Sequence, residues 1–306
     1  MTTTLLQNSI RPADKLAGSY RWARLLFVLI FLNLLGSCST ARLGYSNADT
    51  LMYWWLDGYV DFRSSQKTKV KQDIAQLLSW HRSTQLQHYA QALTQMQSTL
   101  VANPGLGEID AAFRQLEQFS QVMLLKAVPE LTDFALTVDE PQKAYLARKF
   151  EKNNEEFRDK YMELTSEKQA KARFKKIVKQ ADEWLGSVSR EQEAIIARYL
   201  EKHPPNYAQW LDDSVARQRG VLQLLTQMQN EKPSREAAQA MVQRAILANY
   251  EAPDQPERRA QSEAARAAMQ QLISSIIRAS SQEQKTHAHK KLQDWIDDCR
   301  YLMARK

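Results

Sequence analysis

Residues 66–101 read QKTKVKQDIAQLLSWHRSTQLQHYAQALTQMQSTLV. One set of positions in this stretch recurs every three to four residues, which is the spacing of a single helix face. The set comprises Val70, Ile74, Leu77, His81, Leu86, Tyr89, Leu93, Met96 and Leu100. Asn103, Pro104 and Gly105 then stop the pattern. The stretch therefore predicts a long amphipathic helix, which must cover its apolar side with other helices.

The remainder of the chain repeats this pattern. Further helical stripes lie near residues 108–128, 131–136, 142–164, 174–184, 195–200, 210–228, 241–250 and 269–302. Glycine is scarce, at 8 of 306 residues, and no alternating run of β-branched residues is bounded by hairpin turns. We therefore expect an all-α fold, a multi-helix bundle of long amphipathic helices. Several linkers are short, which favours antiparallel packing of consecutive helices.

A short apolar run, Leu25–Leu35, lies near the start of the chain and contains one polar residue, Asn33. Arg21 and Arg24 precede it. A membrane-spanning helix needs about 20 apolar residues, so this run is too short to cross a bilayer comfortably. The charged flank and the short apolar segment are typical of a secretory signal peptide.

The run ends in Leu35, Gly36, Ser37 and Cys38, which resemble the bacterial lipobox. The resemblance implies that a signal peptidase recognises the first three residues and cleaves before Cys38. It also implies a diacylglycerol thioether on that cysteine and a fatty acyl chain, such as palmitate, on the new amino terminus. The alternative is an uncleaved hydrophobic anchor with an incidental cysteine.

This processing divides the chain into a signal peptide (1–37), a lipidated tether (38–47) that we expect to lack regular structure, and an all-helical domain (48–306). Ser39 follows the cysteine. In Gram-negative lipoproteins an Asp at that position usually retains the protein at the inner membrane. Its absence here implies attachment to the outer membrane, with the body on the periplasmic side.

The charge balance gives no reason to expect a nucleic-acid partner. Removal of residues 1–37 takes away four basic residues and one acidic residue, which lowers the formal net charge from +7 to +4. A charge of that size, spread over a long chain, does not make an electrostatic surface for DNA or RNA.

Aromatic side chains are concentrated just after the tether. Asn47 or Asp49 can cap a helix there. On that helix one stripe is formed by Leu51, Trp55, Tyr59 and Phe62. We interpret the stripe as the core contact through which this first helix docks on the others. The alternative is that the rings rest among lipid headgroups beside the anchor.

The same region carries the patterns R-L-x-Y-x-N-A-D and Y-x-W-L-D-x-Y-V-D-F. Together with the lipobox they resemble a family of uncharacterised proteobacterial lipoproteins. The matching positions are Arg42, Leu43, Tyr45, Asn47, Ala48, Asp49, Trp55, Leu56, Asp57, Tyr59, Val60, Asp61 and Phe62. The motif is specific but covers only residues 42–62. The family has no assigned activity, so the resemblance implies neither catalytic residues nor a cofactor.

Three Ser-x-x-Gln sequences begin at Ser166, Ser189 and Ser281. Each fits a helix capping box, in which the serine and the glutamine satisfy each other's backbone amides. The segments after the first and third boxes also look alike, and two copies of one helical unit would explain this. Residues 164–169 are similar to the L-T-x-x-Q boxes of Spy-like periplasmic chaperones, with one extra residue before the glutamine.

The sequence offers little for metal or catalytic chemistry. The histidines are His81, His88, His203, His287 and His289, and none forms the i, i+4 pair that metal sites on helices use. Hydrolase, zinc-protease, P-loop and dinucleotide fingerprints are missing. Cys299 is left without a partner if Cys38 carries lipid. We expect a buried, inert thiol there, the alternative being a reactive or intermolecularly bridged one.

These observations lead to a non-enzymatic binding or structural protein of the cell envelope. Its expected partners are the membrane, through the lipid anchor, and an envelope protein. A helical chaperone or assembly factor is one alternative. An enzyme with an unrecognised site is another.

Overall fold

The computed structural model describes residues 40–251 and 255–305. Within these ranges the chain forms helices and connecting turns and no β-strand, so the prediction of an all-α, multi-helix fold is confirmed. The chain divides into two compact units, Met1–Ser46 and Asn47–Lys306. The described part of the first unit is the helix α2 (Thr40–Ser46). The expectation of an irregular tether is therefore wrong for these residues, which include the good helix formers Ala41, Arg42 and Leu43.

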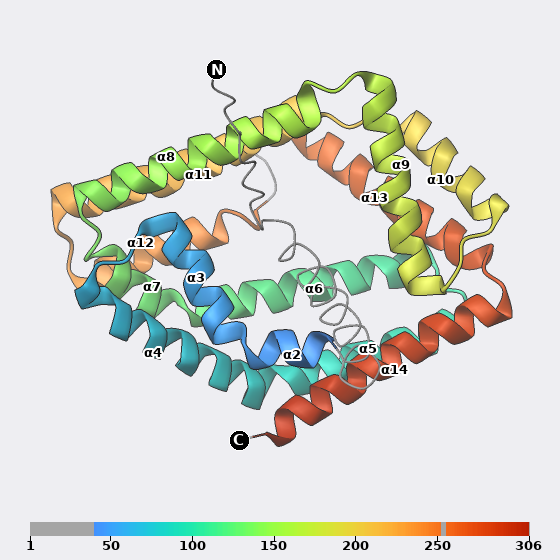
Figure 1. Cartoon of the computed structure of the whole chain (residues 1–306), viewed down its shortest axis with the longest axis horizontal. Coiled ribbons are helices and arrows are strands. Elements are labelled where there is room, and N and C mark those ends of the chain that lie inside the picture. Colours follow the sequence, from blue (N-terminus) through green and yellow to red (C-terminus); the bar gives the residue numbers. More distant parts are fainter. Residues whose placement is uncertain (1–39, 252–254, 306) are drawn as a thin grey trace, which may run out of the picture. The chain divides into compact units, whose positions relative to one another are not determined.

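The second unit contains the remaining helices, among them two short π-helical turns, η1 and η2 (Figure 1). In chain order they are α3 (Ala48–Val60), α4 (Ser64–Trp80), η1 (His81–Gln85), α5 (Leu86–Val101), α6 (Leu106–Lys126), α7 (Val128–Ala135), α8 (Glu140–Phe157), η2 (Arg158–Met162), α9 (Ser166–Leu185), α10 (Arg190–Lys202), α11 (Tyr207–Glu231), α12 (Arg235–Leu247), α13 (Pro256–Arg278) and α14 (Gln282–Ala304).

The long helix predicted over residues 66–101 is present as the continuous series α4, η1 and α5. Its middle is a π-helical turn rather than a regular α-helix. The hydroxyls of Ser83 and Thr84 donate to the carbonyl of Trp80 at 3.1 and 2.8 Å. Such side chains compete with the helical backbone pattern, which accounts for a local bulge at this point.

The most extensive helix pair joins two elements far apart in the sequence. α5 lies along α14 (Figure 1). Between them, Gln97 Nε2 donates to the carbonyl of His289 at 3.1 Å and to Gln293 Oε1 at 3.2 Å. Consecutive helices also pack together, as at α3–α4 and α9–α10. Short linkers therefore account for only part of the packing.

The buried apolar residues of the described second unit form several clusters, and some of these share partly buried neighbours such as Phe134 and Ala135. Four of them contain Tyr53, Phe62, Val70, Ile74 and Leu78; Val128, Met228, Ala238, Met241 and Val242; Leu100, Leu185, Ala288 and Leu292; and Val138, Leu146 and Leu225. Each helix buries one stripe against a few neighbours, so the core is distributed along the helix pairs.

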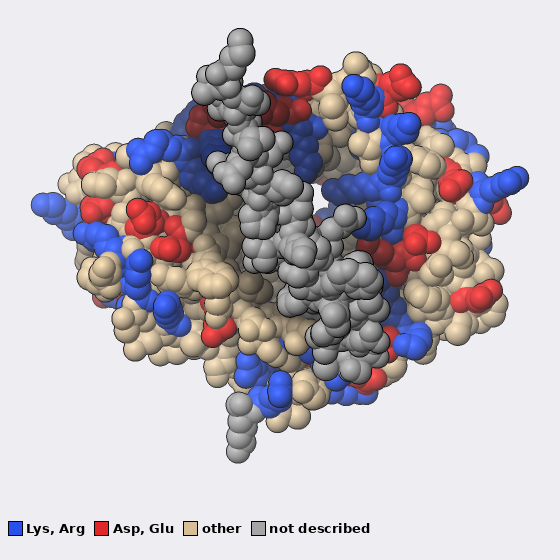
Figure 2. Space-filling model, viewed as in Figure 1, with Lys and Arg blue, Asp and Glu red and all other residues tan. Residues whose placement is uncertain are grey.

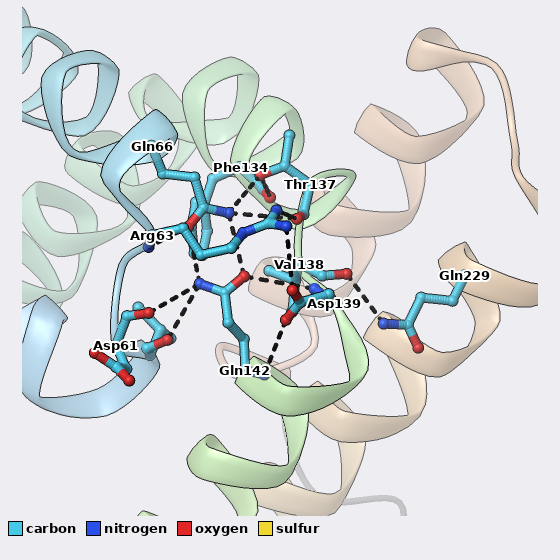
Figure 3. A network of polar contacts seen from close by, with 10 residues as sticks. Asp61, Arg63, Gln66, Phe134, Thr137, Val138, Asp139, Gln142 and Gln229 are labelled. Carbon is cyan, nitrogen blue, oxygen red and sulfur yellow. Dashed lines mark hydrogen bonds and ion pairs between the residues drawn. The ribbon is translucent and has the colours of Figure 1, made fainter.

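Two turns meet where α4 and α8 begin (Figure 3). Gln66 and Gln142 are the third residues of these helices, and their side-chain amides bind each other, at 3.2 Å in one direction and 2.8 Å in the other. Gln66 Oε1 also accepts the backbone N–H of Arg63 at 3.0 Å. Arg63 in turn pairs with Asp139 at 3.1 Å. We call this contact the first glutamine corner.

The same arrangement recurs where α10 and α14 begin. Gln192 Nε2 donates to Gln284 Oε1 at 3.2 Å, and Gln284 Nε2 donates to Gln192 Oε1 at 2.9 Å. Each glutamine also accepts the backbone N–H of its own cap, Ser189 or Ser281, at 2.9 Å. In this second glutamine corner the capping residues of two helices therefore also make the tertiary contact between them.

Candidate functional site

A cleft of about 520 Å³ lies between α8 and α11, with one side chain contributed by α3. These two helices run side by side in Figure 1. The cleft is lined by Tyr59, Phe150, Asn153, Asn154, Phe157, Trp210, Leu211, Asp213, Ser214, Arg217 and Gln218. Its volume falls within the range of roughly 300–1,000 Å³ that is usual for small-ligand sites.

Two amide side chains link the helices across the cleft. Asn154 Nδ2 donates to Gln218 Oε1 at 2.9 Å, and Gln218 Nε2 returns a hydrogen bond to Asn154 Oδ1 at 3.0 Å. Gln218 also donates to the hydroxyl of Ser214 at 3.3 Å. Asn154 is buried. The amides are thus held in one orientation, and each keeps further hydrogen-bonding capacity, because an amide has two N–H donors and two lone pairs.

Aromatic rings form the sides of the cleft. The hydroxyl of Tyr59 accepts a hydrogen bond from Asn153 Nδ2 at 2.9 Å, and its ring lies 6.2 Å from that of Phe150. On α11, the ring of Trp210 packs edge-on against Tyr207, at 5.6 Å, and remains 56% exposed. An aromatic side chain that is fixed by neighbours and still open to solvent can receive a flat apolar surface.

Charged groups border the cleft. Asp213 accepts a hydrogen bond from Arg258 of α13 at 2.7 Å, and Arg217 is exposed on α11. The ammonium group of Lys149 lies 5.6 Å from the centre of the Tyr59 ring. Together, the fixed amides, the open rings and the charged border suit a ligand that has both apolar ring faces and several hydrogen-bonding groups.

The predicted lipidation site lies outside the described residues. This applies to Leu35, Gly36, Ser37 and Cys38 and to the apolar run that precedes them. Among the helices in the described ranges, none has both the length and the apolar character needed to cross a membrane.

Most of the motif residues lie in α2, in α3 or in the turn after α3, and one of them lines the cleft. Arg42 and Tyr45 are in α2, and Asn47 stands at the N-cap of α3 without a side-chain capping bond. Asp49 is in the first turn of α3. Tyr59 is the motif residue that lines the cleft.

The acidic motif residues Asp57 and Asp61 form the turn from α3 to α4. The carboxylate of Asp57 accepts the backbone N–H of Phe62 at 2.8 Å. Asp61 adopts a left-handed conformation with φ of 48°, and its carbonyl accepts a hydrogen bond from Gln142 Nε2 at 3.2 Å. These residues therefore lead the chain into the first glutamine corner.

The predicted core stripe of α3 is wrong for two of its four members. Phe62 is buried and Tyr59 half-buried, but Leu51 and Trp55 are 53% and 62% exposed. Tyr53 is buried instead, in the cluster with Phe62. The helix face that docks on α4 is thus rotated relative to the predicted stripe, because α3 carries apolar residues around most of its circumference.

Two of the three predicted capping boxes are confirmed. The hydroxyls of Ser189 and Ser281 accept the N–H groups of Gln192 and Gln284, at 3.2 Å in both cases. The box at Ser166 is wrong by one residue, because Thr165 caps α9 and accepts the N–H of Lys168 at 3.4 Å.

The two segments that looked alike in the sequence meet in space. Trp184 of α9 and Trp295 of α14 pack edge to face at 5.0 Å. The two tryptophans thus contact each other where α9 packs on α14. That the two segments are copies of one helical unit stays a prediction.

His81, His287 and Cys299 make contacts with neighbouring helices or helix turns, whereas the side chains of His88, His203 and His289 are exposed. His81 Nε2 lies 3.0 Å from the hydroxyl of Tyr89, and burial lowers the pKa of this histidine. His287 Nδ1 lies 3.1 Å from the carbonyl of Trp184. Burial, and to a smaller extent Asp298, raises the pKa of the Cys299 thiol. Across the described residues, no group of three or more His, Cys, Asp or Glu side chains could hold a metal ion.

Sequence reasoning missed the cleft amides and the first glutamine corner. Asp139 and Gln142 form a capping box, with Gln142 N donating to Asp139 Oδ1 at 3.0 Å, and the pattern Asp-x-x-Gln was a usable signal for it. Asn154 and Gln218 are isolated polar residues within amphipathic helices. No local sequence pattern indicates that these two side chains face one another.

Neither a curated protein nor a solved structure matches this chain. A family model described as a family of unknown function, DUF6279, matches residues 58–249. The match includes the whole of α8 and α11 and all the residues that line the cleft. It covers more than half of the 306 residues, which confirms membership in an uncharacterised family. The chain belongs to the DUF6279 family of unknown function.

Proposed function

We propose that this protein is a lipid-anchored, non-enzymatic binding protein of the bacterial envelope that holds a glycan in the cleft between α8 and α11. Cys38 carries the lipid, and the body lies on the periplasmic side of the outer membrane. The single observation that carries the binding role is the pairing of fixed amides with open aromatic rings in one cleft. The address rests on the lipobox at Leu35–Cys38.

The chemistry of the cleft supports a sugar polymer. A sugar ring offers an apolar C–H face, which packs on rings such as that of Trp210, and hydroxyl or acetamido groups, which pair with amides. Arg217 adds a cation that suits the carboxylates of cell-wall glycans. A protein at the periplasmic face of the outer membrane would meet such strands directly.

Binding to the cell wall tests the role of the cleft. Purified lipidated protein in detergent is mixed with isolated peptidoglycan sacculi, and the bound fraction is measured after sedimentation. Trp210→Ala should weaken binding about fivefold or more, since an aromatic contact contributes roughly 1 kcal/mol. Trp54→Ala is the matched control, because Trp54 is similarly exposed but lies outside the cleft.

Two results would overturn the proposal. One is a wild-type protein that stays in the supernatant while a photocrosslinker at position 210 captures an envelope protein in cells, which would assign the cleft to a protein partner. The other is turnover of peptidoglycan by the purified protein, which would make it an enzyme.

The anchor is tested separately by palmitate incorporation and mass spectrometry. Cys38→Ser should leave an unprocessed precursor without labelled fatty acid. Cys299→Ser, which removes the other cysteine, should be labelled like the wild type. Equal labelling of Cys38→Ser and the wild type would contradict lipidation at Cys38.

A further inference from the structure

Helix α3 presents a second apolar face that the core does not use. Leu51, Trp54 and Trp55 have the i, i+3, i+4 spacing of one helix side and are 53%, 65% and 62% exposed. We call these three residues the tryptophan face. The opposite side of the helix contributes Tyr53 to the cluster with Val70 and Ile74. α3 therefore packs on α4 and α8, and the side that carries the tryptophan face is exposed.

Two adjacent exposed tryptophans are an unusual surface feature. Contiguous exposed apolar groups usually mark a contact with a partner or a membrane. Tryptophan is enriched where a bilayer meets water, because its ring is apolar while its N–H can stay hydrated. Figure 2 shows mostly uncharged surface over the middle of α3.

Two acidic residues of α3 lie near this face, and their carboxylates make local hydrogen bonds. The carboxylate of Asp57 is engaged by the backbone N–H of Phe62 at 2.8 Å, and that of Asp49 by the N–H of Thr50 at 2.7 Å. Both carboxylates are thus occupied in local helix contacts.

The position of α3 in the chain indicates that the partner of the tryptophan face is the membrane. Leu51 follows Cys38 by thirteen residues, which span at most roughly 45 Å when fully extended. The seven helical residues of α2 shorten that reach further. A lipid on Cys38 would therefore keep α3 close to the bilayer surface.

We infer that the tryptophan face rests in the headgroup region of the membrane that holds the lipid anchor. This inference rests on the proposed lipidation of Cys38. The face would act as a second attachment that sets the orientation of the helical body, whereas acyl chains alone leave a tethered protein free to rotate. Acyl chains combined with a second membrane contact are a common arrangement among anchored proteins.

Fluorescence quenching tests the contact. Mature lipidated protein is reconstituted into vesicles of phosphatidylethanolamine and phosphatidylglycerol whose acyl chains are brominated near the headgroup. Wild-type emission should be quenched relative to vesicles of unbrominated lipid. The double variant Trp54→Phe/Trp55→Phe should lose most of that quenching. Trp210→Phe, which removes an exposed tryptophan of α11, should retain it. Circular dichroism verifies that all variants fold.

The outcomes separate this inference from the anchor itself. Protein that floats with the vesicles but is quenched equally in wild type and double variant keeps the anchor and overturns the membrane contact of α3. Protein that does not float overturns both. A double variant that changes the oligomeric state, while wild-type emission is unquenched by lipid, assigns the face to a second copy of the chain instead.

Discussion

Gln66 and Gln142 bind each other through their side-chain amides, 76 residues apart in the chain, while each also belongs to the first turn of its own helix. The pair is buried, and its N–H groups also reach the carbonyls of Thr137 and Asp61. A local capping interaction is thereby extended into a tertiary contact between two helix starts.

Gln66→Ala should therefore destabilise the protein by about 1–3 kcal/mol, because it removes the hydrogen bonds that Gln66 makes with the buried Gln142 amide and with the backbone N–H of Arg63. The measurement is chemical unfolding followed by circular dichroism. Gln72→Ala, at an exposed position on the same helix, should change the free energy of unfolding by no more than about 0.5 kcal/mol.

A double-mutant cycle with Gln142→Ala sharpens this prediction. The two single effects should not add, and the coupling should amount to roughly 0.5–3 kcal/mol. Strictly additive effects would mean that the glutamines act only as separate caps.

Gly186 ends α9 in a left-handed conformation, with φ of 75°. A methyl group at this residue would lie 2.9 Å from Cδ2 of His287. Gly186→Ala should therefore cost at least about 1–2 kcal/mol, the expense of the left-handed backbone alone. Gly220→Ala provides the opposite case. Gly220 lies within α11, and a methyl group added there would have no side chain or neighbouring element within 4 Å. This substitution should stabilise the protein by about 0.5–1 kcal/mol. If both substitutions changed the free energy of unfolding in the same direction, the left-handed backbone of Gly186 would not explain the effect.

Asp110 joins α6 to α13. Its carboxylate accepts hydrogen bonds from Arg266 at 2.9 Å and Gln270 at 2.7 Å. The Arg266 hydrogen bond is the main reason that the pKa of Asp110 lies below its ordinary value of 3.8. A lowered folded-state pKa gives stabilisation that is complete above the unfolded value and disappears as the pH falls through the folded one.

Asp110→Asn should therefore lower the melting temperature at pH 7, and the difference from wild type should shrink as the pH is lowered below 3.8. Thermal unfolding at both ends of this range measures it. Asp294→Asn, which removes an exposed pair with Lys290 within one helix, should have little effect at either pH. If the difference in melting temperature between Asp110→Asn and the wild type stayed constant with pH, the ionised carboxylate of Asp110 would not be its cause.

Cys299 is half-buried, and burial disfavours its thiolate. Because the thiolate is the reactive form, the folded protein should react with a disulfide reagent at pH 8 about tenfold more slowly than the unfolded protein. A cysteine introduced at the exposed position Thr286, in a Cys299→Ser background, should react rapidly in the folded state. Equal rates for the two cysteines would show that Cys299 is accessible.

Most of the contacts in the cleft could not be predicted from the sequence, although the helices that carry the cleft residues were expected. Tyr59 was identified through a motif, but its partner Asn153 is 94 residues away. Asn154 and Gln218 come from separate helices, and each looks like an ordinary polar position in its own helix. The exposure of Trp55 was also unexpected, since an apolar residue on a helix does not itself indicate which of two apolar sides will be covered.

The sequence by itself determined that the described chain is helical, and roughly where most of its helices lie. Those properties are local: residue spacing defines an amphipathic face, and caps, prolines and glycines interrupt it. Only the tertiary structure decided that α5 lies along α14, that the capping glutamines meet in pairs, and that α8 and α11 enclose a cleft. Many amphipathic helices have equally suitable apolar sides, so the choice among partners depends on packing over the whole unit rather than on any one segment.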